Sequence, residues 1–484
     1  MQACVPTILR PLAHLVNHAL ESAVYPSDLK LAKVMALYKK QEHFYPENYR
    51  PISLLSIIDK IFERLIRKRF MQFINKHKII ILNQYGFLEK HSTLLALIDV
   101  IDKIKNIIEN GEFALGIYLD LKKAFDTVDH NILLSKLDHY GFRGHANDFI
   151  KSYLTGRKQF TVINGTNSET HEIKTGVPQG SVLGPIFFLL YINDIISCLT
   201  NEDAILFADD TSVLLHNKDS KILKLHAEAA MVKLYDWLIS NKLSLNMEKT
   251  FFIIFHPNRK LVDPNFNHLK FYNYTIKRAT SVVYLGMILD ENLNWKLHIN
   301  QLCNNLSKYF HVFYNLRNIL TVPLKKLLYY SFIHSRIQYG IQLYGTCSKT
   351  LLNKIQTLQN KLLKVLFNKP YRTSTNVLHA EFELPKVHHV YCMSVLKFVY
   401  QAINKDSIEQ FNNYFQLRDT LHNHNTRNRY HIISNRVRTA YGANTVHNQG
   451  ASLWNNLSHD IRQSKSYNAF KRTLKKHFYK KLCP

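Results

Sequence analysis

Three aspartates in this sequence stand where a carboxylate could do chemistry. Asp120 directly follows the apolar run ALGIYL, and Asp209 and Asp210 separate the apolar runs AILFA and TSVLL. A charge at the end of a buried strand is unfavourable unless it faces water or a metal ion. Mg²⁺ prefers oxygen ligands and is usually held by one or two carboxylates together with substrate phosphates. Because two such ions can stabilise the attacking and leaving oxygens of a phosphoryl transfer, the three aspartates predict a two-metal site.

A structural interpretation of the acidic pair competes with this one. Turns rich in aspartate are common in hairpins, and for Asp209 and Asp210 alone this interpretation is as strong as the first. Asp120 is harder to explain as a turn residue, because LDLKKAFDTVDH continues directly into a helix. Asp120 therefore favours the metal-binding interpretation.

Hydrophobic periodicity predicts the elements that must position these aspartates. Helical patterns dominate residues 8–110, and a strand pattern begins at Phe113. Residues 204–215 predict a hairpin whose turn presents the acidic pair. Residues 281–289 are a further strand candidate, and the chain is helical again from about residue 300 to residue 366. The sequence therefore predicts an α/β middle between two helical regions.

The charge balance indicates a polyanionic partner. The 484 residues include 63 Lys and Arg against 36 Asp and Glu, a formal net charge of +27. Such an excess favours nucleic acid or an anionic membrane over a merely soluble basic protein. The six cysteines share no Cys-x-x-Cys spacing, which indicates a reducing compartment. The most apolar run, 182–199, contains Pro185, Asn193 and Asp194, so it predicts a buried helix rather than a membrane span.

Several ordered motifs resemble the reverse transcriptases of non-long-terminal-repeat retrotransposons of the jockey and chicken-repeat grouping. The central motifs are YLDLKKAFDTVDH (118–130), TGVPQGSVLGPIFFLLYINDI (175–195) and FADDT (207–211). The flanking motifs are NYRPISLL (48–55), KIFERLI (60–66), NQYGF (83–87), LSLNMEKTFFIIF (243–255) and YLGMILDENLNW (284–295). Together they cover roughly residues 20–300 in order, which is far more specific than one acidic pair.

The resemblance implies roles for individual residues. It implies that Asp120, Asp209 and Asp210 hold two Mg²⁺ ions, with Mn²⁺ as a possible substitute, and that Lys249 protonates the leaving pyrophosphate. The substrate-binding positions of the family fall on Lys39, Lys40, Arg50, Phe125, Gln179 and Gly180. The primer-grip hairpin falls on Tyr284, Leu285 and Gly286.

Two of these assignments have ordinary structural alternatives. Phe125 matches the steric gate against the 2′-hydroxyl of the incoming nucleotide, but a Phe one turn into a helix is commonly a core residue. Arg50 and one of the two lysines of LYKK would grip the triphosphate, but such a pair alone is more often a solvated charge pair. Gln179 would lie near the nucleotide sugar.

The implied fold class is α+β, a right-hand polymerase with a palm built on an antiparallel sheet. The expected domains are fingers at 1–112 with a partial N-terminus, a palm at 113–296 with an inserted fingers segment near 134–175, a helical thumb at 297–370, and a mainly helical, basic C-terminal extension at 371–484. Residues 467–482 predict an amphipathic helix with a basic face suited to nucleic acid.

The implied function is an RNA-directed DNA polymerase that extends a DNA primer on an RNA template with deoxynucleoside triphosphates. The alternative is a decayed or co-opted remnant that binds RNA without polymerising; Leu88, where the family usually has Arg, keeps it open. An RNA-copying RNA polymerase is disfavoured by Phe125. We expect an intracellular protein of the nucleus or cytoplasm, without a signal peptide, a transmembrane segment or membrane contact. We also expect the endonuclease to be supplied elsewhere, because no apurinic-type endonuclease precedes the polymerase motifs.

Overall fold

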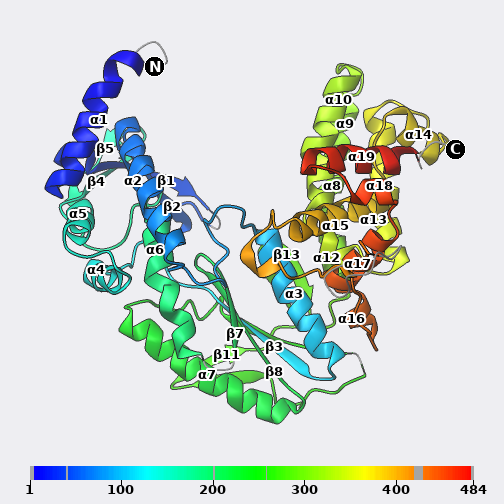
Figure 1. Ribbon diagram of the computed structural model, residues 1–484, viewed down its shortest axis with the longest axis horizontal. Helices are drawn as coiled ribbons and strands as arrows, with labels where there is room; N and C mark the ends of the chain where they lie inside the picture. Colours follow the sequence, from blue (N-terminus) through cyan, green and yellow to red (C-terminus); the bar gives the residue numbers. More distant parts are fainter. Residues whose placement is uncertain (1–4, 40–41, 200–201, 258, 419–428, 481–484) are drawn as a thin grey trace. The chain divides into compact units, whose positions relative to one another are not determined.

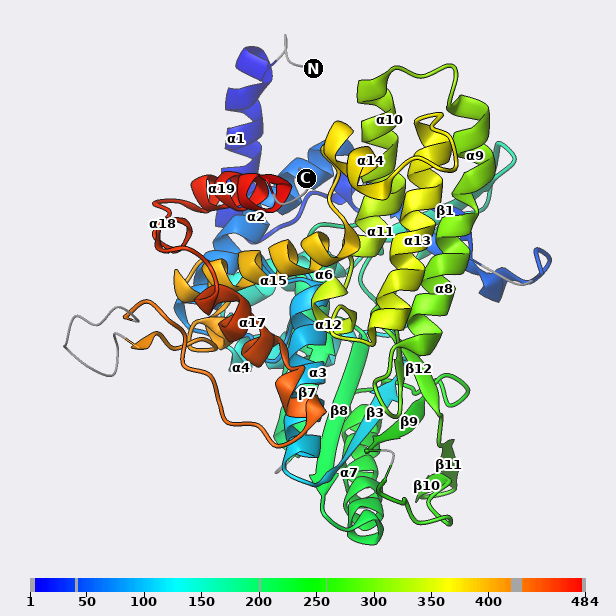
Figure 2. The ribbon, with the colours of Figure 1, turned by 90° about the vertical axis from the view of Figure 1, so that its right-hand side faces the viewer.

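Figures 1 and 2 show the computed structural model, which describes residues 5–39, 42–199, 202–257, 259–418 and 429–480. The chain divides into two compact units. The first contains the residues up to 87 together with 119–212 and 228–250, and the second contains 88–118, 213–227 and the residues from 251 onward. Each unit contains both helices and strands, so the predicted α+β class is confirmed.

A five-stranded sheet belongs to the first unit. Its order is β2-β1-β4-β5, with β6 paired to β4. The strands are β1 (Leu31–Tyr38), β2 (Tyr49–Leu54), β4 (Lys158–Ile163), β5 (Thr166–Asn167) and β6 (His171–Glu172). The helical prediction for residues 8–110 is wrong at β1 and β2. Antiparallel pairing between them and parallel pairing of β1 with β4 satisfy backbone groups that a helix would have satisfied internally.

Helices surround that sheet in the first unit. They are α1 (Val5–Ser22), α2 (Ile57–Lys76), α4 (His130–His139), α5 (His145–Leu154) and α6 (Gly184–Ile192), with short 3₁₀ turns at Ser27–Leu29, Pro46–Asn48 and Asn193–Cys198. Every described residue of α6 except Pro185 is buried, which confirms a buried helix in the apolar run 182–199. The residues of α7 (Ser220–Ser240) are shared between the two units.

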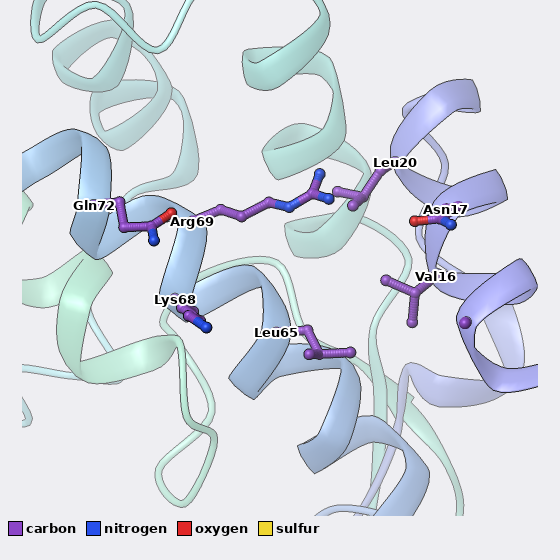
Figure 3. A pocket seen from close by; sticks show the side chains of 8 residues that line it. Val16, Asn17, Leu20, Leu65, Lys68, Arg69 and Gln72 are labelled. Atoms are coloured by element: carbon purple, nitrogen blue, oxygen red, sulfur yellow. The ribbon is translucent and has the colours of Figure 1, made fainter. Parts of the chain in front are cut away.

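Helices α1 and α2 line an open cavity of about 410 Å³ (Figure 3). Val16, Leu20 and Leu65 supply apolar walls, and the Arg69 side chain extends across the cavity toward Leu20. None of the residues predicted to do chemistry lines this cavity. This cavity is therefore separate from the predicted site residues.

A four-stranded sheet has the order β7-β8-β3-β9. Its strands are β7 (Asp203–Phe207), β8 (Asp210–Asn217), β3 (Phe113–Leu119) and β9 (Phe251–Phe255). All seven residues of β3 are buried, and β3 pairs antiparallel with β9. The predicted strand at Phe113 and the predicted hairpin over 204–215 are both confirmed. Since β3 is buried along its whole length, the first carboxylate after it stands at the strand's exit.

Two hairpins belong to the second unit. They pair β10 (His268–Phe271) with β11 (Tyr274–Lys277), and β12 (Ser281–Tyr284) with β13 (Met287–Asp290). The strand candidate at 281–289 is therefore two strands rather than one. Leu285 and Gly286 have φ angles of +44° and +80°, and two consecutive residues with positive φ form the tight turn that hairpins favour.

The rest of the second unit is mainly helical, which confirms the helical prediction for residues 300–366. The α-helices are α3 (Thr93–Glu109), α8 (Lys296–Ser307), α9 (Tyr309–Leu316), α10 (Val322–Leu328), α11 (Ser335–Gln338), α12 (Ile341–Tyr344), α13 (Lys349–Leu366), α14 (Thr375–Glu381), α15 (Val387–Ile403), α16 (Ala440–Ala443), α17 (Val446–Asn455), α18 (His459–Arg462) and α19 (Tyr467–Lys480). A π-helical segment at Tyr329–His334 follows α10, and a 3₁₀ turn lies at Glu409–Phe411. Figure 2 shows α15 and α17, which pack against each other.

Helix α3 packs against the C-terminal extension. The buried Asp102 carboxylate accepts hydrogen bonds from the backbone N–H groups of Val446, at 3.0 Å, and His447, at 3.2 Å, where α17 begins. The Tyr414 hydroxyl donates to the same carboxylate. Residues 88–118 thus fold with the extension in the second unit. The four-part division of fingers, palm, thumb and extension stays a prediction, and the two units cut across its boundaries.

The predicted amphipathic helix at 467–482 is α19, with Phe470, Leu474 and Phe478 buried. Leu482 lies outside the described residues. Within the part of the chain that the structure describes, no helix combines the length and the apolar character needed to cross a membrane.

Candidate active site

The chain after β3 is held by the segment that precedes β9. The Lys122 N–H donates to the Ser244 carbonyl at 2.8 Å, and the Asn246 N–H donates to the Asp120 carbonyl at 2.7 Å. The Asn246 side-chain amide also donates to Asp120 Oδ2 at 2.9 Å, and Lys249 Nζ lies 3.3 Å from the same oxygen. One carboxylate oxygen of Asp120 is therefore fixed by two donors from one short segment.

Lys249 was expected to protonate the leaving pyrophosphate. The structure places its ammonium in an ion pair with Asp120, with 44% of the Lys249 side chain exposed. The ammonium is thus beside the predicted metal-binding carboxylate and open to solvent. Its role as a proton donor stays a prediction.

The turn between β7 and β8 carries Asp209 and is fixed by the segment NQYGF. The Gln84 side-chain oxygen accepts from the backbone N–H groups of Ala208, at 3.1 Å, and Gly86, at 2.8 Å. Gln84 is 1% exposed, and Ala208 has a φ of +56°, so a buried amide supports a left-handed residue next to the acidic pair. The motif NQYGF predicts no role for Gln84, which only the structure reveals.

The three carboxylates lie close enough for their charges to interact. The pKa of Asp209 is raised by burial first and then by the negative charge of Asp120, while Arg50 and Lys39 lower it. The Asp210 side chain is more exposed, and its pKa is raised to about 6 by partial burial of the carboxyl group and by the charges of Asp209 and Asp120. The structure therefore brings together all three predicted aspartates.

This donor set fits divalent cations. Among the described residues, no group of three or more His, Cys, Asp or Glu side chains is arranged so that these side chains alone could hold a metal ion. Mg²⁺ does not require one, because it usually takes one or two carboxylates and completes its shell with water and substrate phosphates. The negative charges of Asp120 and Asp209 raise the pKa of Asp210, and a cation beside these carboxylates would offset that repulsion.

The predicted triphosphate-binding cations lie in the same unit. Arg50 is an exposed residue of β2, directly opposite Leu37 of β1. Lys39 follows β1, and its N–H donates to the Asn48 carbonyl at 2.9 Å. Because both charges act on Asp209, the structure places them near the carboxylates. Lys40 lies outside the described residues.

Gln179 and Gly180 lie in the loop before α6. The Gln179 side-chain amide donates to Asp126 Oδ1 at 2.9 Å, and the Gln179 carbonyl accepts from the Ser53 N–H at 2.7 Å. Gly180 has a φ of +119°, and a Cβ there would lie 2.6 Å from the Ser53 carbonyl oxygen. Only glycine fits such an approach, so this loop is pressed against β2.

Phe125 is half-buried. Its ring stacks on Phe188 with 4.5 Å between ring centroids and meets the ring of Phe87 edge-on at 6.1 Å. One face of the Phe125 ring is therefore packed like that of a core residue. The steric-gate role stays a prediction.

The predicted primer-grip residues belong to the second unit, in the β12–β13 hairpin. The buried Tyr284 ring lies 4.9 Å from the Tyr118 ring, and the Leu285 carbonyl accepts from the Tyr339 hydroxyl. Gly286 completes the turn. Their contact with a primer stays a prediction.

Three supporting residues were missed: Gln84, Asp126 and Asn246. Each lies inside one of the motifs that carry the family resemblance. Each uses a side-chain amide or carboxylate to hold a predicted site residue or the turn beside it. Polar residues within these motifs were the available signal, but their partners are 53 to 126 residues away in sequence.

Comparisons with known proteins identify the family of the chain. Residues 38–289 match the family described as reverse transcriptase (RNA-dependent DNA polymerase). The RNA-directed DNA polymerase from the mobile element jockey of Drosophila melanogaster is 30% identical over 394 residues, and the probable RNA-directed DNA polymerase from transposon BS of the same organism is 29% identical over 392 residues. Each alignment covers 78% of this chain and 42% of the relative.

Apo telomerase from Candida tropicalis is a distant structural neighbour, 12% identical with a TM-score of 0.39, covering 80% of this chain and 67% of that chain. A likeness at that level supports no argument about function. The family match is decisive, because it spans more than half of the 484 residues and includes the three carboxylates. The chain belongs to the reverse transcriptase (RNA-dependent DNA polymerase) family, as its ordered motifs predict.

Proposed function

We propose that this chain is the RNA-directed DNA polymerase of a retrotransposon, which adds deoxynucleotides to a primer 3′-end on an RNA template. The observation that carries the proposal is the gathering of Asp120, Asp209 and Asp210, from the end of a strand and a hairpin turn, with the positive charges of Arg50 and Lys39 acting on Asp209. Phosphoryl transfer needs positioning and stabilisation of negative charge more than covalent chemistry, and this site is built for both.

Reverse transcriptases depend on divalent metal ions. In this chain Asp120, Asp209 and Asp210 would hold two Mg²⁺ ions, or Mn²⁺ in their place. When bound, such ions neutralise charge on the attacking and leaving oxygens. Asn246 keeps one oxygen of Asp120 in a hydrogen bond, which restricts the rotation of the carboxylate and orients its other oxygen.

The cations around the carboxylates suit a nucleoside triphosphate. Arg50 offers a planar fork that matches phosphate oxygens, and Lys39 offers a point charge. Lys249 is a half-exposed ammonium 3.3 Å from Asp120 Oδ2, and it would deliver a proton to the departing pyrophosphate. Phe125 and Gln179 would contact the sugar of the nucleotide.

The net charge of +27 suits an RNA template and a DNA primer, whose phosphates release counterions when basic side chains bind them. The chain spans 42% of the length of its jockey and BS relatives, so the activity of a whole element protein is part of this proposal. An endonuclease supplied elsewhere would provide the primer 3′-hydroxyl during insertion.

The test is primer extension with the purified chain. A DNA primer annealed to RNA is incubated with deoxynucleoside triphosphates and Mg²⁺, with Mn²⁺ or ribonucleotides in parallel reactions. Extension with deoxynucleotides that stops on chelation supports the proposal. RNA binding without extension under every condition would overturn it in favour of the RNA-binding remnant. Preferential extension with ribonucleotides would indicate an RNA-copying RNA polymerase.

A further inference from the structure

The loop that carries Gln179 is paired with the segment that follows Asp120. The Val177 N–H donates to the Phe125 carbonyl at 2.8 Å, and the Gly176 N–H donates to the Val128 carbonyl at 2.8 Å. These two backbone hydrogen bonds place residues 125–128 and 176–177 side by side. Asp126 and Thr127 lie between Phe125 and Val128 in the first segment.

The far end of the same loop is held by a buried carboxylate. Glu63 on α2 is fully buried and accepts a hydrogen bond from the Val182 N–H at 2.6 Å. The Tyr153 hydroxyl donates to the other oxygen of Glu63. The loop backbone is therefore fixed on both sides of Gln179, and what remains to be set is the direction of the Gln179 amide.

Asp126 can set that direction because of its chemistry. A carboxylate only accepts hydrogen bonds, whereas a glutamine amide has a donor side and an acceptor side. With Asp126 Oδ1 at 2.9 Å, the Gln179 nitrogen must face Asp126, and the Gln179 oxygen is turned away from it. Partial burial raises the pKa of Asp126, while the hydrogen bond from Gln179 and the charge of Lys123 lower it.

We infer that Asp126 is a positioning residue, which fixes the Gln179 amide so that its oxygen is presented as a hydrogen-bond acceptor to the incoming nucleotide. The inference rests on the proposed function, because Gln179 needs a nucleotide to contact. Gln179 is partly exposed, so its amide is accessible to a ligand. Phe125, the neighbour of Asp126, lies on the same short segment, so one segment would control both sugar contacts.

The experiment is a double-mutant cycle with Asp126→Ala and Gln179→Ala, measured as kcat and KM for a deoxynucleotide in primer extension. Each single variant should raise KM about tenfold with little change in kcat, since a hydrogen bond to a charged group contributes about 1.5 kcal/mol or more and 1.4 kcal/mol is tenfold. The double variant should be no worse than Gln179→Ala alone, because Asp126 acts only through Gln179.

Asp129→Ala is the matched control. Asp129 lies three residues further along, caps α4 through the N–H groups of Asn131 and Ile132, and pairs with Lys242 at 2.6 Å. Its loss should lower stability, and any effect on KM should add to that of Gln179→Ala. A merely structural Asp126 would behave like this control.

Asp126→Asn separates orientation from contact. Asn can accept from the Gln179 nitrogen or donate to its oxygen, so about half of the amides would be turned, and KM should rise about twofold. If Asp126→Ala does not fold, Asp126→Leu, which has the same branching at Cγ but no hydrogen-bond acceptor, takes its place. Additive effects in the cycle, or a Gln179→Ala variant with unchanged KM, would overturn the inference while leaving the polymerase proposal intact. A wild-type chain that never extends primers would instead overturn the proposed function.

Discussion

Replacing Asp209 by Asn should separate catalysis from folding. The change removes one negative charge and almost preserves the side-chain volume. In the folded chain, burial and the charge of Asp120 raise the pKa of Asp209, which means that the ionised form is held there at a free-energy cost. We therefore expect Asp209→Asn to be at least as stable as the wild type, by up to about 1 kcal/mol in the free energy of unfolding.

The expected loss of activity is large. Asp209 is half-buried, so an effective dielectric constant of about 20 is appropriate, and a unit charge about 4 Å from a charged group then interacts by about 4 kcal/mol. Since 1.36 kcal/mol corresponds to a factor of ten in rate, removing the charge should slow primer extension about a thousandfold. RNA binding should stay unchanged, because it depends on the net basic surface.

The assay compares extension rate, RNA affinity and urea unfolding for the wild type, Asp209→Asn and the control Asp138→Asn. Asp138 is an exposed residue of α4, so its variant should match the wild type in all three measurements. If Asp209→Asn extends primers within tenfold of the wild type, the metal-binding assignment is refuted. If its free energy of unfolding falls by several kcal/mol, Asp209 is a structural turn residue instead.

Three further predictions address other parts of the chain. Phe125→Val should raise the incorporation of ribonucleotides relative to deoxynucleotides and cost about 1–2 kcal/mol of stability, because a half-buried ring is truncated; unchanged discrimination in a folded variant would make Phe125 a core residue only. Asp102→Asn should lower the free energy of unfolding by about 2 kcal/mol, since one acceptor for the α17 N–H groups becomes a donor. Burial raises the pKa of Asp102 in the folded chain. The difference in free energy of unfolding between the wild type and Asp102→Asn should therefore shrink as the pH rises above the ordinary aspartate range. Urea titrations at several pH values test this, and a difference that grows with pH would contradict it. Finally, incubation of supercoiled plasmid with Mg²⁺ should give no nicked circles with the wild type or Asp120→Asn, and equal nicking by both would reveal a second active centre.

The sequence was sufficient to predict the strands and helices that are determined by neighbouring residues. The buried strand before Asp120 and the hairpin at 204–215 follow from apolar runs that end at charges, and the structure confirms both. It was insufficient where the secondary structure depends on pairing with a distant strand. The apolar residues of LAKVMALY suit a helix as well as a strand, and only pairing with β2 and β4 makes β1 a strand.

The folding of α3 with the C-terminal extension was also beyond sequence reasoning. The hydrogen bond from the Val446 N–H to Asp102 joins residues separated by 344 positions, and Glu109 accepts from the Thr439 N–H across 330 positions. Helical periodicity indicates that one face of a helix is apolar, but it does not indicate which distant segment packs against that face. A charged residue within such a face, as Asp102 is in α3, was the available signal, because a buried carboxylate must find donors.

The contacts that surround the carboxylates bear on the choice between a polymerase and an RNA-binding remnant. A remnant that only binds RNA needs a basic surface, and the net charge of +27 supplies one whether or not any side chain near Asp120 is oriented. The chain nevertheless forms specific supports for the site. Asn246 holds Asp120, Gln84 holds the turn that carries Asp209, and Asp126 holds Gln179. None of these hydrogen bonds adds positive charge for RNA, and one of them holds Asp120, whose negative charge raises the pKa values of Asp209 and Asp210. Supports of this kind are expected where the geometry around the carboxylates matters, which is a requirement of catalysis and not of electrostatic binding, so they favour the polymerase over the remnant.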